Sequence, residues 1–139
     1  MDVQRDKENE DRKAGIMPRN ISFALTTEQI KNRTKTVTRR DGWARVSIGE
    51  ILNGCVKCMG LKPGEKIERL CQIRVTNVRR EPLRRLTDDL DYGFRETTLE
   101  GFPEGHPKHF QSAFVEMFCA SHGGVTPDST ITRIEFEYV

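Results

Sequence analysis

The segment Ile67–Arg80 carries the clearest β pattern in the chain, and it sets the kind of fold that the chain can adopt. Apolar and polar side chains alternate through its centre, with Cys71, Ile73 and Val75 on one face and Gln72, Arg74 and Thr76 on the other. Such a period of two places one face of a strand against a core. Val78 breaks the phase, so we expect a bulge or a strand end near Asn77.

Shorter elements flank this strand on both sides. Ile21–Leu25 alternates like a half-buried strand, and Thr26 and Gln29 have the spacing of a capping box, which predicts a short helix through Asn32. We expect residues 35–40 to return as a strand and Thr130–Val139 to form the last one, because Ile134, Phe136 and Tyr138 alternate there with charged residues.

The segment that begins at Pro107 has the period of a helix. Its apolar residues recur at helical spacing, namely Phe110, Ala113, Phe114, Met117 and Phe118. A proline suits the first turn, and Gly123-Gly124 ends the pattern. We interpret the phenylalanine stripe as core packing rather than as a cofactor site. A few short strands with two or three helices predict an α+β fold, a small mixed β-barrel with flanking helices.

The length of 139 residues fits one folded domain. The first thirteen residues are mostly charged and contain no aromatic side chain, so burial cannot offset the entropy cost of ordering them. We therefore expect a charged, disordered tail over residues 1–17 and the domain over residues 18–139. No apolar run approaches the ~20 residues that cross a bilayer, and no secretory signal is present, which predicts a cytoplasmic protein without a membrane partner.

Basic residues are concentrated in two stretches. The first holds Lys31, Arg33, Lys35, Arg39, Arg40 and Arg45, and the second holds Arg74, Arg79, Arg80, Arg84 and Arg85. If the two stretches share a face, they create a positive field suited to phosphates. A solvated face that nearby acids balance is the equal alternative.

Two short blocks carry the groups with chemistry: Lys35-Thr36-Val37-Thr38-Arg39-Arg40 and Glu100-Gly101-Phe102-Pro103. Guanidinium and ammonium groups bind phosphate or carboxylate. A lysine beside a threonine hydroxyl and a carboxylate can instead activate a nucleophile, provided that burial lowers the pKa of the amine. The glycine and the proline of the second block form a turn that would fix the carboxylate. The same residues can therefore bind or catalyse.

Taken in this order, the two blocks resemble the ASCH domain family, small β-barrels related to the RNA-binding PUA domains. The resemblance covers residues 21–139 and includes the turn Gly49–Leu52 into a strand and the closing segment Arg133–Tyr138. It implies either an RNA-binding module or an enzyme that hydrolyses N4-acetylcytidine with a Lys, Thr and Glu set, without a metal or other cofactor. Carried over, that set is Lys35, Thr38 and Glu100. The inserted segment Asn53–Lys66 and the charged tail depart from the family pattern.

Strand geometry opposes the catalytic assignment. Lys35 and Thr38 are three residues apart, so in a plain strand they face opposite sides, and both can line one pocket only if the chain bends near Lys35 and Thr36. Without that bend, Thr36 and Thr38 share a face with Arg40, which suits phosphate binding. A further alternative is a buried salt bridge between this block and Glu100, for which Glu96 competes.

Other candidate groups carry weaker signals. Trp43 either stacks on a base or covers the core. Cys55 and Cys58 have the spacing of zinc ligands, with Cys71, Cys119 and His122 as candidate partners. Their spacings are not those of a zinc ribbon or finger, so we expect free thiols rather than a metal. His106, His109 and His122 are expected in surface or capping roles.

We therefore predict a monomeric domain that binds RNA or a modified nucleoside in a basic cleft formed by Lys35, Thr38 and Glu100, with Arg33, Thr36, Arg39, Arg40 and Trp43 as further binding residues. The alternative is an amidohydrolase that removes an acyl group from N4-acylated cytidine. In it, Thr38 is the nucleophile, Lys35 takes the proton and Glu100 protonates the leaving nitrogen. A protein-interaction module recruited through the tail and the arginine-rich segment is the third hypothesis.

Overall fold

One curved sheet of five strands organises the computed structural model, which describes residues 18–139. The strand order is β1-β3-β4-β5-β2. The strands are β1 (Arg19–Ser22), β2 (Val37–Arg40), β3 (Ile51–Cys55), β4 (Arg69–Pro82) and β5 (Thr130–Tyr138). The helices are α2 (Thr27–Lys31), α3 (Arg85–Asp88), α4 (Leu90–Leu99) and α5 (Gln111–Ser121), with short 3-10 helices η1 (Ala24–Thr26) and η2 (Pro107–His109).

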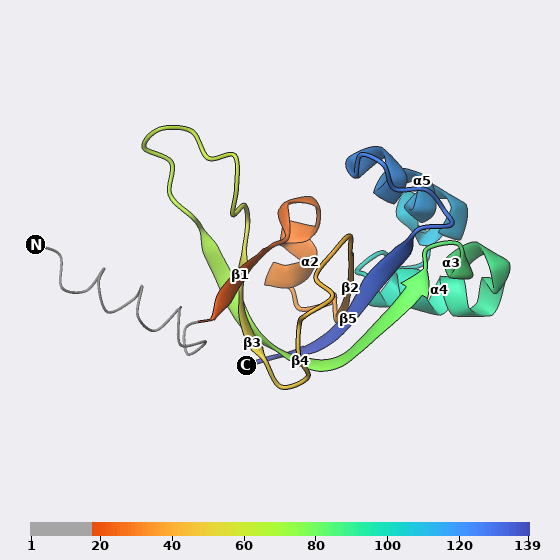
Figure 1. Ribbon diagram of the computed structural model, residues 1–139, viewed down its shortest axis with the longest axis horizontal. Helices are drawn as coiled ribbons and strands as arrows, with labels where there is room; N and C mark the ends of the chain where they lie inside the picture. Colours follow the sequence, from red (N-terminus) through yellow and green to blue (C-terminus); the bar gives the residue numbers. More distant parts are fainter. Residues whose placement is uncertain (1–17) are drawn as a thin grey trace, which may run out of the picture.

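Strand β4 is the spine of the sheet and pairs with β3 on one side and β5 on the other, both antiparallel. Ile73 and Val75 are buried, and the register shifts between Val75 and Asn77, so the predicted bulge is confirmed. A bulge adds bend and twist to a strand, and β4 is visibly curved in Figure 1. The sheet thereby forms a half-barrel, which confirms the predicted α+β fold.

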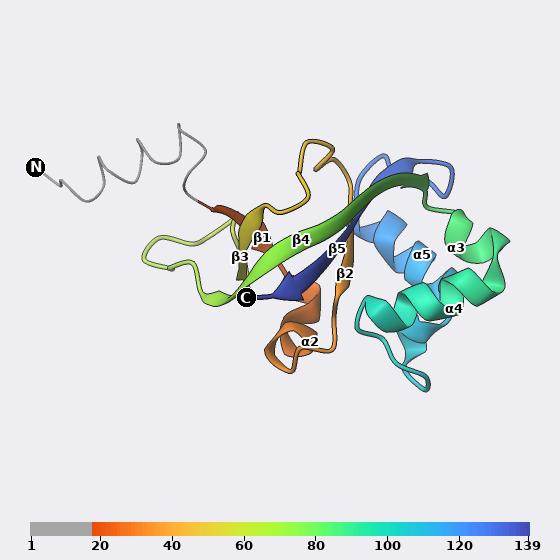
Figure 2. The same ribbon diagram turned by 90° about the horizontal axis from the view of Figure 1, so that it is seen from below.

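The helices lie in two groups around β2, an edge strand that pairs only with β5 in the sheet. Helix α2 lies on one side of β2, while α4 and α5 lie on the other, as Figures 1 and 2 show from two directions. None of the helices within residues 18–139 is both long and apolar enough to cross a membrane. The expected disordered tail lies outside the described residues.

Two hydrophobic clusters form the core. The first includes Ile21, Phe23, Ile30, Leu52, Ile73, Val75, Ile134 and Phe136. The second, between the end of the sheet and the helices, includes Leu83, Leu86, Tyr92, Phe102, Phe114, Phe118 and Ile131. Because each cluster has its own helices, β2 runs along the boundary between them.

The amino-terminal elements differ from the sequence-based expectation. Strand β1 ends at Ser22, and η1 follows, so Leu25 is 69% exposed instead of half-buried. Thr26 precedes α2 without a side-chain capping bond, and the hydroxyl of the next residue, Thr27, donates to the carbonyl of Phe23. The predicted capping box does not form.

The helix predicted from Pro107 is divided in two. Pro107 begins the short η2, and Phe110 has an extended backbone (φ −67°, ψ 128°) that separates η2 from α5. Phe110 is consequently 60% exposed, whereas Phe114 and Phe118 pack in the core as expected. The strand expected over residues 35–40 likewise begins only at Val37.

Candidate functional site

A pocket of about 250 Å³ lies where β2 passes between the two hydrophobic clusters. Its lining comprises Ser22, Phe23, Ala24, Leu25, Thr26, Lys35, Thr38, Arg39, Arg40, Glu100, Phe102, Phe114, Met117, Phe118, Ser121 and His122. We call this cavity the β2 pocket. It contains Lys35, Thr38 and Glu100 together, the set that the sequence singled out, and two of the five further binding candidates.

The bend that this arrangement requires precedes β2. Arg33 adopts a left-handed conformation (φ 61°), and the backbone N–H groups of Thr34 and Lys35 both donate to the carbonyl of Gln29. The N–H of Thr36 donates to the carbonyl of Leu99. Lys35 therefore belongs to the turn that follows α2 and not to the strand, so its side chain and that of Thr38 can line the same pocket.

Lys35 and Glu100 form a buried ion pair in the pocket. The Lys35 amine donates to Oε1 of Glu100 at 2.7 Å and to the Glu100 carbonyl oxygen at 2.9 Å. Burial lowers the pKa of Lys35, although the charge and hydrogen bond of Glu100 oppose that effect. The buried salt bridge considered as an alternative for this block is therefore present, and Glu100 rather than Glu96 is the partner of Lys35.

Arg39 connects the pocket to a second layer of buried charges. Its Nη1 donates to the other carboxylate oxygen of Glu100 at 3.0 Å, and its Nη2 donates to Glu96 at 2.6 Å. Arg133 also donates to both oxygens of Glu96. Burial opposes the charged form of Arg39, but Glu100 and Glu96 outweigh it and raise the pKa of this guanidinium. Its Nη2 also donates to Glu81 at 3.4 Å, so Arg39 holds three carboxylates in place.

Arg40 lines the pocket on the same face of β2 as Thr38. Its Nε donates to the Thr38 hydroxyl at 3.0 Å, and its guanidinium carbon lies 5.0 Å from the ring centroid of Phe23. Burial lowers the pKa of Arg40 to about 10, so it remains a cation at neutral pH. Within residues 18–139, Arg40 has no carboxylate at ion-pair distance.

The wall opposite the polar groups is aromatic and was missed as part of a site. Phe114, Met117 and Phe118 from α5 line it, together with Phe102. His122, which follows α5, stacks on Phe118 at 4.2 Å between ring centroids, and its Nδ1 donates to the Phe118 carbonyl. A flat, apolar ring fits between such walls, with hydrogen-bonding groups at one end.

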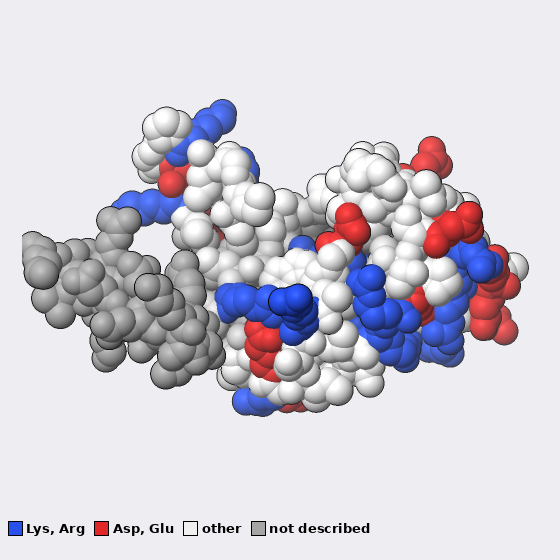
Figure 3. Space-filling view, viewed as in Figure 1, with Lys and Arg blue, Asp and Glu red and all other residues white. Residues whose placement is uncertain are grey.

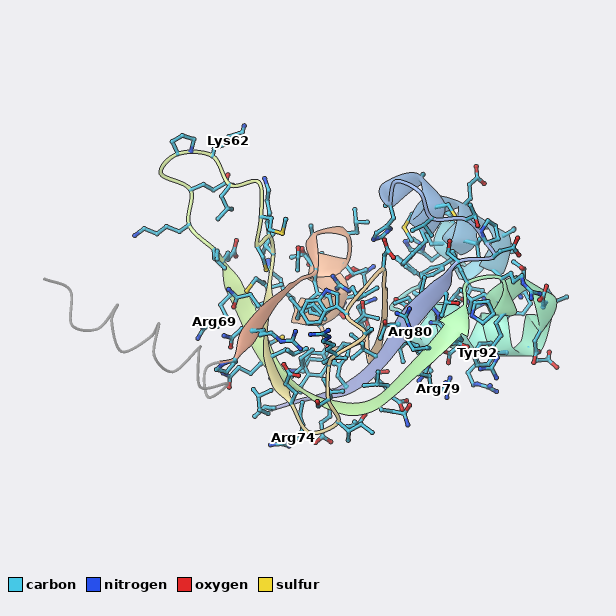
Figure 4. The ribbon with its side chains drawn as sticks, viewed as in Figure 1. Lys62, Arg69, Arg74, Arg79, Arg80 and Tyr92 are labelled. Atoms are coloured by element: carbon cyan, nitrogen blue, oxygen red, sulfur yellow. The ribbon has the colours of Figure 1, made fainter. Side chains whose placement is uncertain are left out.

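A separate group of arginines lies around Tyr92, where β4 meets α3 and α4. The guanidinium carbons of Arg85, Arg95 and Arg79 lie 4.0, 5.6 and 6.0 Å from its ring centroid. Figure 4 shows Arg79 and Arg80 at this end of β4 and Arg74 farther along it. In Figure 3, lysine and arginine side chains gather here, whereas the surface around the hollow between α2 and α5 is largely uncharged.

Three predicted binding residues lie outside the pocket lining. The guanidinium of Arg33 lies over the ring of Tyr138 at 5.3 Å, and Thr36 makes backbone bonds to Leu99 and Phe136. Trp43 packs against the first hydrophobic cluster, and Arg19 lies over its ring at 5.0 Å. Their roles in binding stay predictions. The four cysteines carry free thiols, and no group of three metal-ligating side chains was found within residues 18–139.

Comparison with solved structures identifies the fold, although comparison of sequences does not. No protein-family model and no curated protein matches the sequence. Among solved structures, the chain is similar to an ASCH domain from Lactobacillus crispatus, with a TM-score of 0.56, 13% identity, and coverage of 99% of this chain and 95% of that one. It is also similar to a protein from Enterococcus faecalis described under the family DUF984, with a TM-score of 0.52, 17% identity, and coverage of 99% and 92%.

Proposed function

We propose that this chain, whose fold is that of an ASCH domain, binds a single nucleoside in the β2 pocket, either free or displaced from an RNA strand. The observation that carries the proposal is the pairing of an aromatic wall from α5 with a row of polar groups on β2 across one small cavity. Nucleoside bases are recognised by stacking on one surface and by hydrogen bonds at their edges.

The size of the pocket favours one base over a strand. Its volume of about 250 Å³ is just below the ~300–1,000 Å³ typical of pockets for larger ligands. An RNA segment would have to follow the outer surface of the protein and insert only one nucleotide into the β2 pocket. The arginines around Tyr92, exposed at the end of β4, offer phosphate contacts for such a segment.

The free edge of β2 supplies further hydrogen-bonding groups. The N–H of Phe136 donates to the carbonyl of Thr36, and alternate residues of an antiparallel pair share backbone bonds. Thr38 and Arg40 therefore bond to β5, which leaves the backbone N–H and C=O of Arg39, a residue of the pocket lining, on the edge away from β5. A backbone N–H and C=O side by side can bind an acceptor and a donor on the edge of a base.

Binding can be tested by blocking the mouth of the pocket. Ala24 lines the pocket and is exposed, so Ala24→Trp should fill the entrance without disturbing the core. Ala44→Trp, at an exposed alanine outside the lining, is the matched control. Calorimetric titration with cytidine, N4-acetylcytidine and a short single-stranded RNA should show binding that Ala24→Trp weakens at least about tenfold, or about 1.4 kcal/mol, and that Ala44→Trp preserves. Equal affinities of the two variants would remove the pocket as the binding site.

A second candidate function, hydrolysis of an N4-acyl group, is favoured by the bend that brings Lys35 and Thr38 to one pocket and by the lowered pKa of Lys35. In this reaction the Thr38 oxygen bonds to the acyl carbon while Lys35 takes the hydroxyl proton. The C–N bond then breaks as Lys35 passes that proton to the exocyclic nitrogen, which leaves as the amine of cytidine, and water hydrolyses the threonine ester to acetate and free Thr38. Lys35 is an ammonium in its ion pair with Glu100, so it must first lose a proton before it can take the one from Thr38.

Isosteric variants test the catalytic candidate. Thr38→Val should abolish release of acetate from N4-acetylcytidine, and Thr36→Val, outside the pocket lining, should retain it. The melting temperatures of both variants should match that of the wild type, so that a loss of activity reports on the missing hydroxyl and not on unfolding. Acetate release that persists in Thr38→Val would exclude Thr38 as the nucleophile, and no release by the wild-type chain would leave nucleoside binding alone.

A further inference from the structure

Arg40 is the charged group of the β2 pocket whose charge is not matched. The other cations that line the pocket have carboxylate partners, since Lys35 pairs with Glu100 and Arg39 pairs with Glu100 and Glu96. Arg40 makes one hydrogen bond to a neutral hydroxyl and lies over an aromatic ring. Within residues 18–139, no hydrogen bond from its terminal Nη1 and Nη2 was found.

The surrounding charges make this mismatch specific to Arg40. The fully buried cations are Lys35, Arg39 and Arg133, and the fully buried carboxylates are Glu81, Glu96 and Glu100. These groups balance, three against three, so the partly buried Arg40 adds one positive charge with no counter-charge. Burying a charge without a partner is costly, and an anionic ligand that supplies the partner would remove that cost.

The guanidinium is also held in one orientation. The bond from Nε to Thr38 fixes one edge of the group, and the ring of Phe23 lies against its face. The remaining edge presents Nη1 and Nη2, the fork that matches two oxygens of a carboxylate or a phosphate. Because Thr38 and Arg40 share a face of β2, this fork belongs to the same cavity as the aromatic wall of α5.

We infer that the β2 pocket takes a ligand with an anionic group, a phosphate or a carboxylate, whose two oxygens receive the terminal N–H groups of Arg40. The inference rests on the proposed function in that the remainder of the ligand is a nucleoside. The pocket should therefore bind a nucleotide, or a nucleoside that carries a carboxylate, more tightly than a neutral nucleoside.

The experiment compares ligands that differ in this group. Cytidine, cytidine 5′-monophosphate, orotidine and inorganic phosphate are titrated into the full chain by calorimetry. The variants are Arg40→Gln, Arg40→Lys and Arg80→Gln. Arg80 lies on the same face two strands away, since both Arg40 and Arg80 are paired with Thr132, and it does not line the pocket, so it controls for general charge.

We expect the monophosphate or orotidine to bind at least about tenfold more tightly than cytidine, as a charge-assisted bidentate contact provides. That ratio should fall to about one in Arg40→Gln, recover in part in Arg40→Lys, and stay unchanged in Arg80→Gln. Cytidine 5′-monophosphate and orotidine also distinguish the two anionic groups. Tighter binding of the monophosphate identifies a phosphate as the group that Arg40 binds, and tighter binding of orotidine identifies a carboxylate. Without ligand, Arg40→Gln should melt no lower than the wild type, since it removes an unmatched charge.

Failure of the inference is distinguishable from failure of the proposed function. Equal binding of cytidine and both anionic ligands, or an anion preference that survives in Arg40→Gln, overturns the anion subsite and leaves the nucleoside pocket intact. Phosphate binding that Arg40→Gln removes, without any nucleoside binding, supports the subsite and refutes the nucleoside function. No binding of any of the four ligands refutes both. A clear loss of melting temperature in unliganded Arg40→Gln also counts against the subsite, because Arg40 would then be a structural group.

Discussion

The amine of Lys35 lies 2.7 Å from the carboxylate of Glu100, although the two residues are 65 positions apart in the chain. Both side chains are almost fully buried, at 3% and 4% exposure, so the interaction is shielded from solvent. Arg39 donates to the second oxygen of the same carboxylate. Glu100 therefore neutralises two cations that come from one short segment of the chain.

Glu100→Gln should destabilise the fold more than Lys35→Met. The first change leaves two buried cations short of a partner, a loss of about 3 kcal/mol. After the second change Glu100 still has Arg39, so the loss should be about 1–2 kcal/mol. Urea unfolding at pH 7 measures both values. The double variant should lose less than the sum of the two, and strict additivity would show that the pair is not coupled.

Glu96 should make stability sensitive to acid. Burial alone would raise its pKa, but the hydrogen bond from Arg133 and the charge of Arg39 outweigh burial and hold the pKa below the ordinary value of 4.5. The folded state thus takes up this proton less readily than the unfolded state, so the stabilisation is complete above pH 4.5 and is lost as the pH falls through the folded pKa.

Thermal unfolding from pH 6 to pH 3 tests this assignment. Glu96→Gln should be less stable than the wild type at pH 6, by about 3 kcal/mol, and its melting temperature should fall less on acidification. Glu137→Gln, at an exposed pair with Arg74, should follow the wild-type curve. Parallel curves for Glu96→Gln and the wild type would contradict the lowered pKa.

Gly101 should tolerate no side chain, because it has a φ of +102° and lies against α2 and Lys35. An added Cβ would meet Cγ of Gln29 at 2.8 Å and Cβ of Lys35 at 3.4 Å. Gly105 has a similar φ of +94° with nothing within 4 Å, so Gly105→Ala measures the backbone strain alone, about 1–3 kcal/mol. Gly101→Ala should cost more than this control and should also weaken ligand binding, because Glu100 would shift. Equal losses in the two variants would show that the close packing is unimportant.

If the chain binds RNA, the salt dependence should come from the arginines around Tyr92. Arg79→Gln/Arg95→Gln should reduce the slope of log affinity against log salt by about 1 for each arginine removed. Arg74→Gln, farther along β4 and paired with Glu137, should leave the slope unchanged (Figure 4). Arg39→Gln should destabilise the fold without affecting the slope, since Arg39 is 4% exposed. Fluorescence titrations at several salt concentrations would detect these changes, and an unaltered slope in the double variant would discard this surface.

Sequence periodicity predicted the strands and helices that bury one face and expose the other. The bulge near Asn77 follows from the phase break at Val78. Periodicity does not group Lys35, Thr38 and Glu100. The resemblance to the ASCH family implies that set, and the three residues line one pocket. The break at Phe110 could not be predicted, since it depends on the backbone after η2. The core position predicted for Phe118 is confirmed, but the contribution of Phe118 and His122 to the pocket lining could not be predicted, because no local pattern shows that a helix faces a cavity. The neighbours of Arg39 could not be predicted either, because only the tertiary fold brings Glu96 on α4 and Arg133 on β5 next to it.

The position of β2 at the edge of the sheet has a consequence for solution behaviour. An unpaired strand edge is a template on which another chain can add a strand, unless a helix or loop covers it. Strand β2 is covered in this way, because helices lie on both sides of it and Val37, Thr38 and Arg39 are buried. The helices therefore protect this edge from strand addition and aggregation.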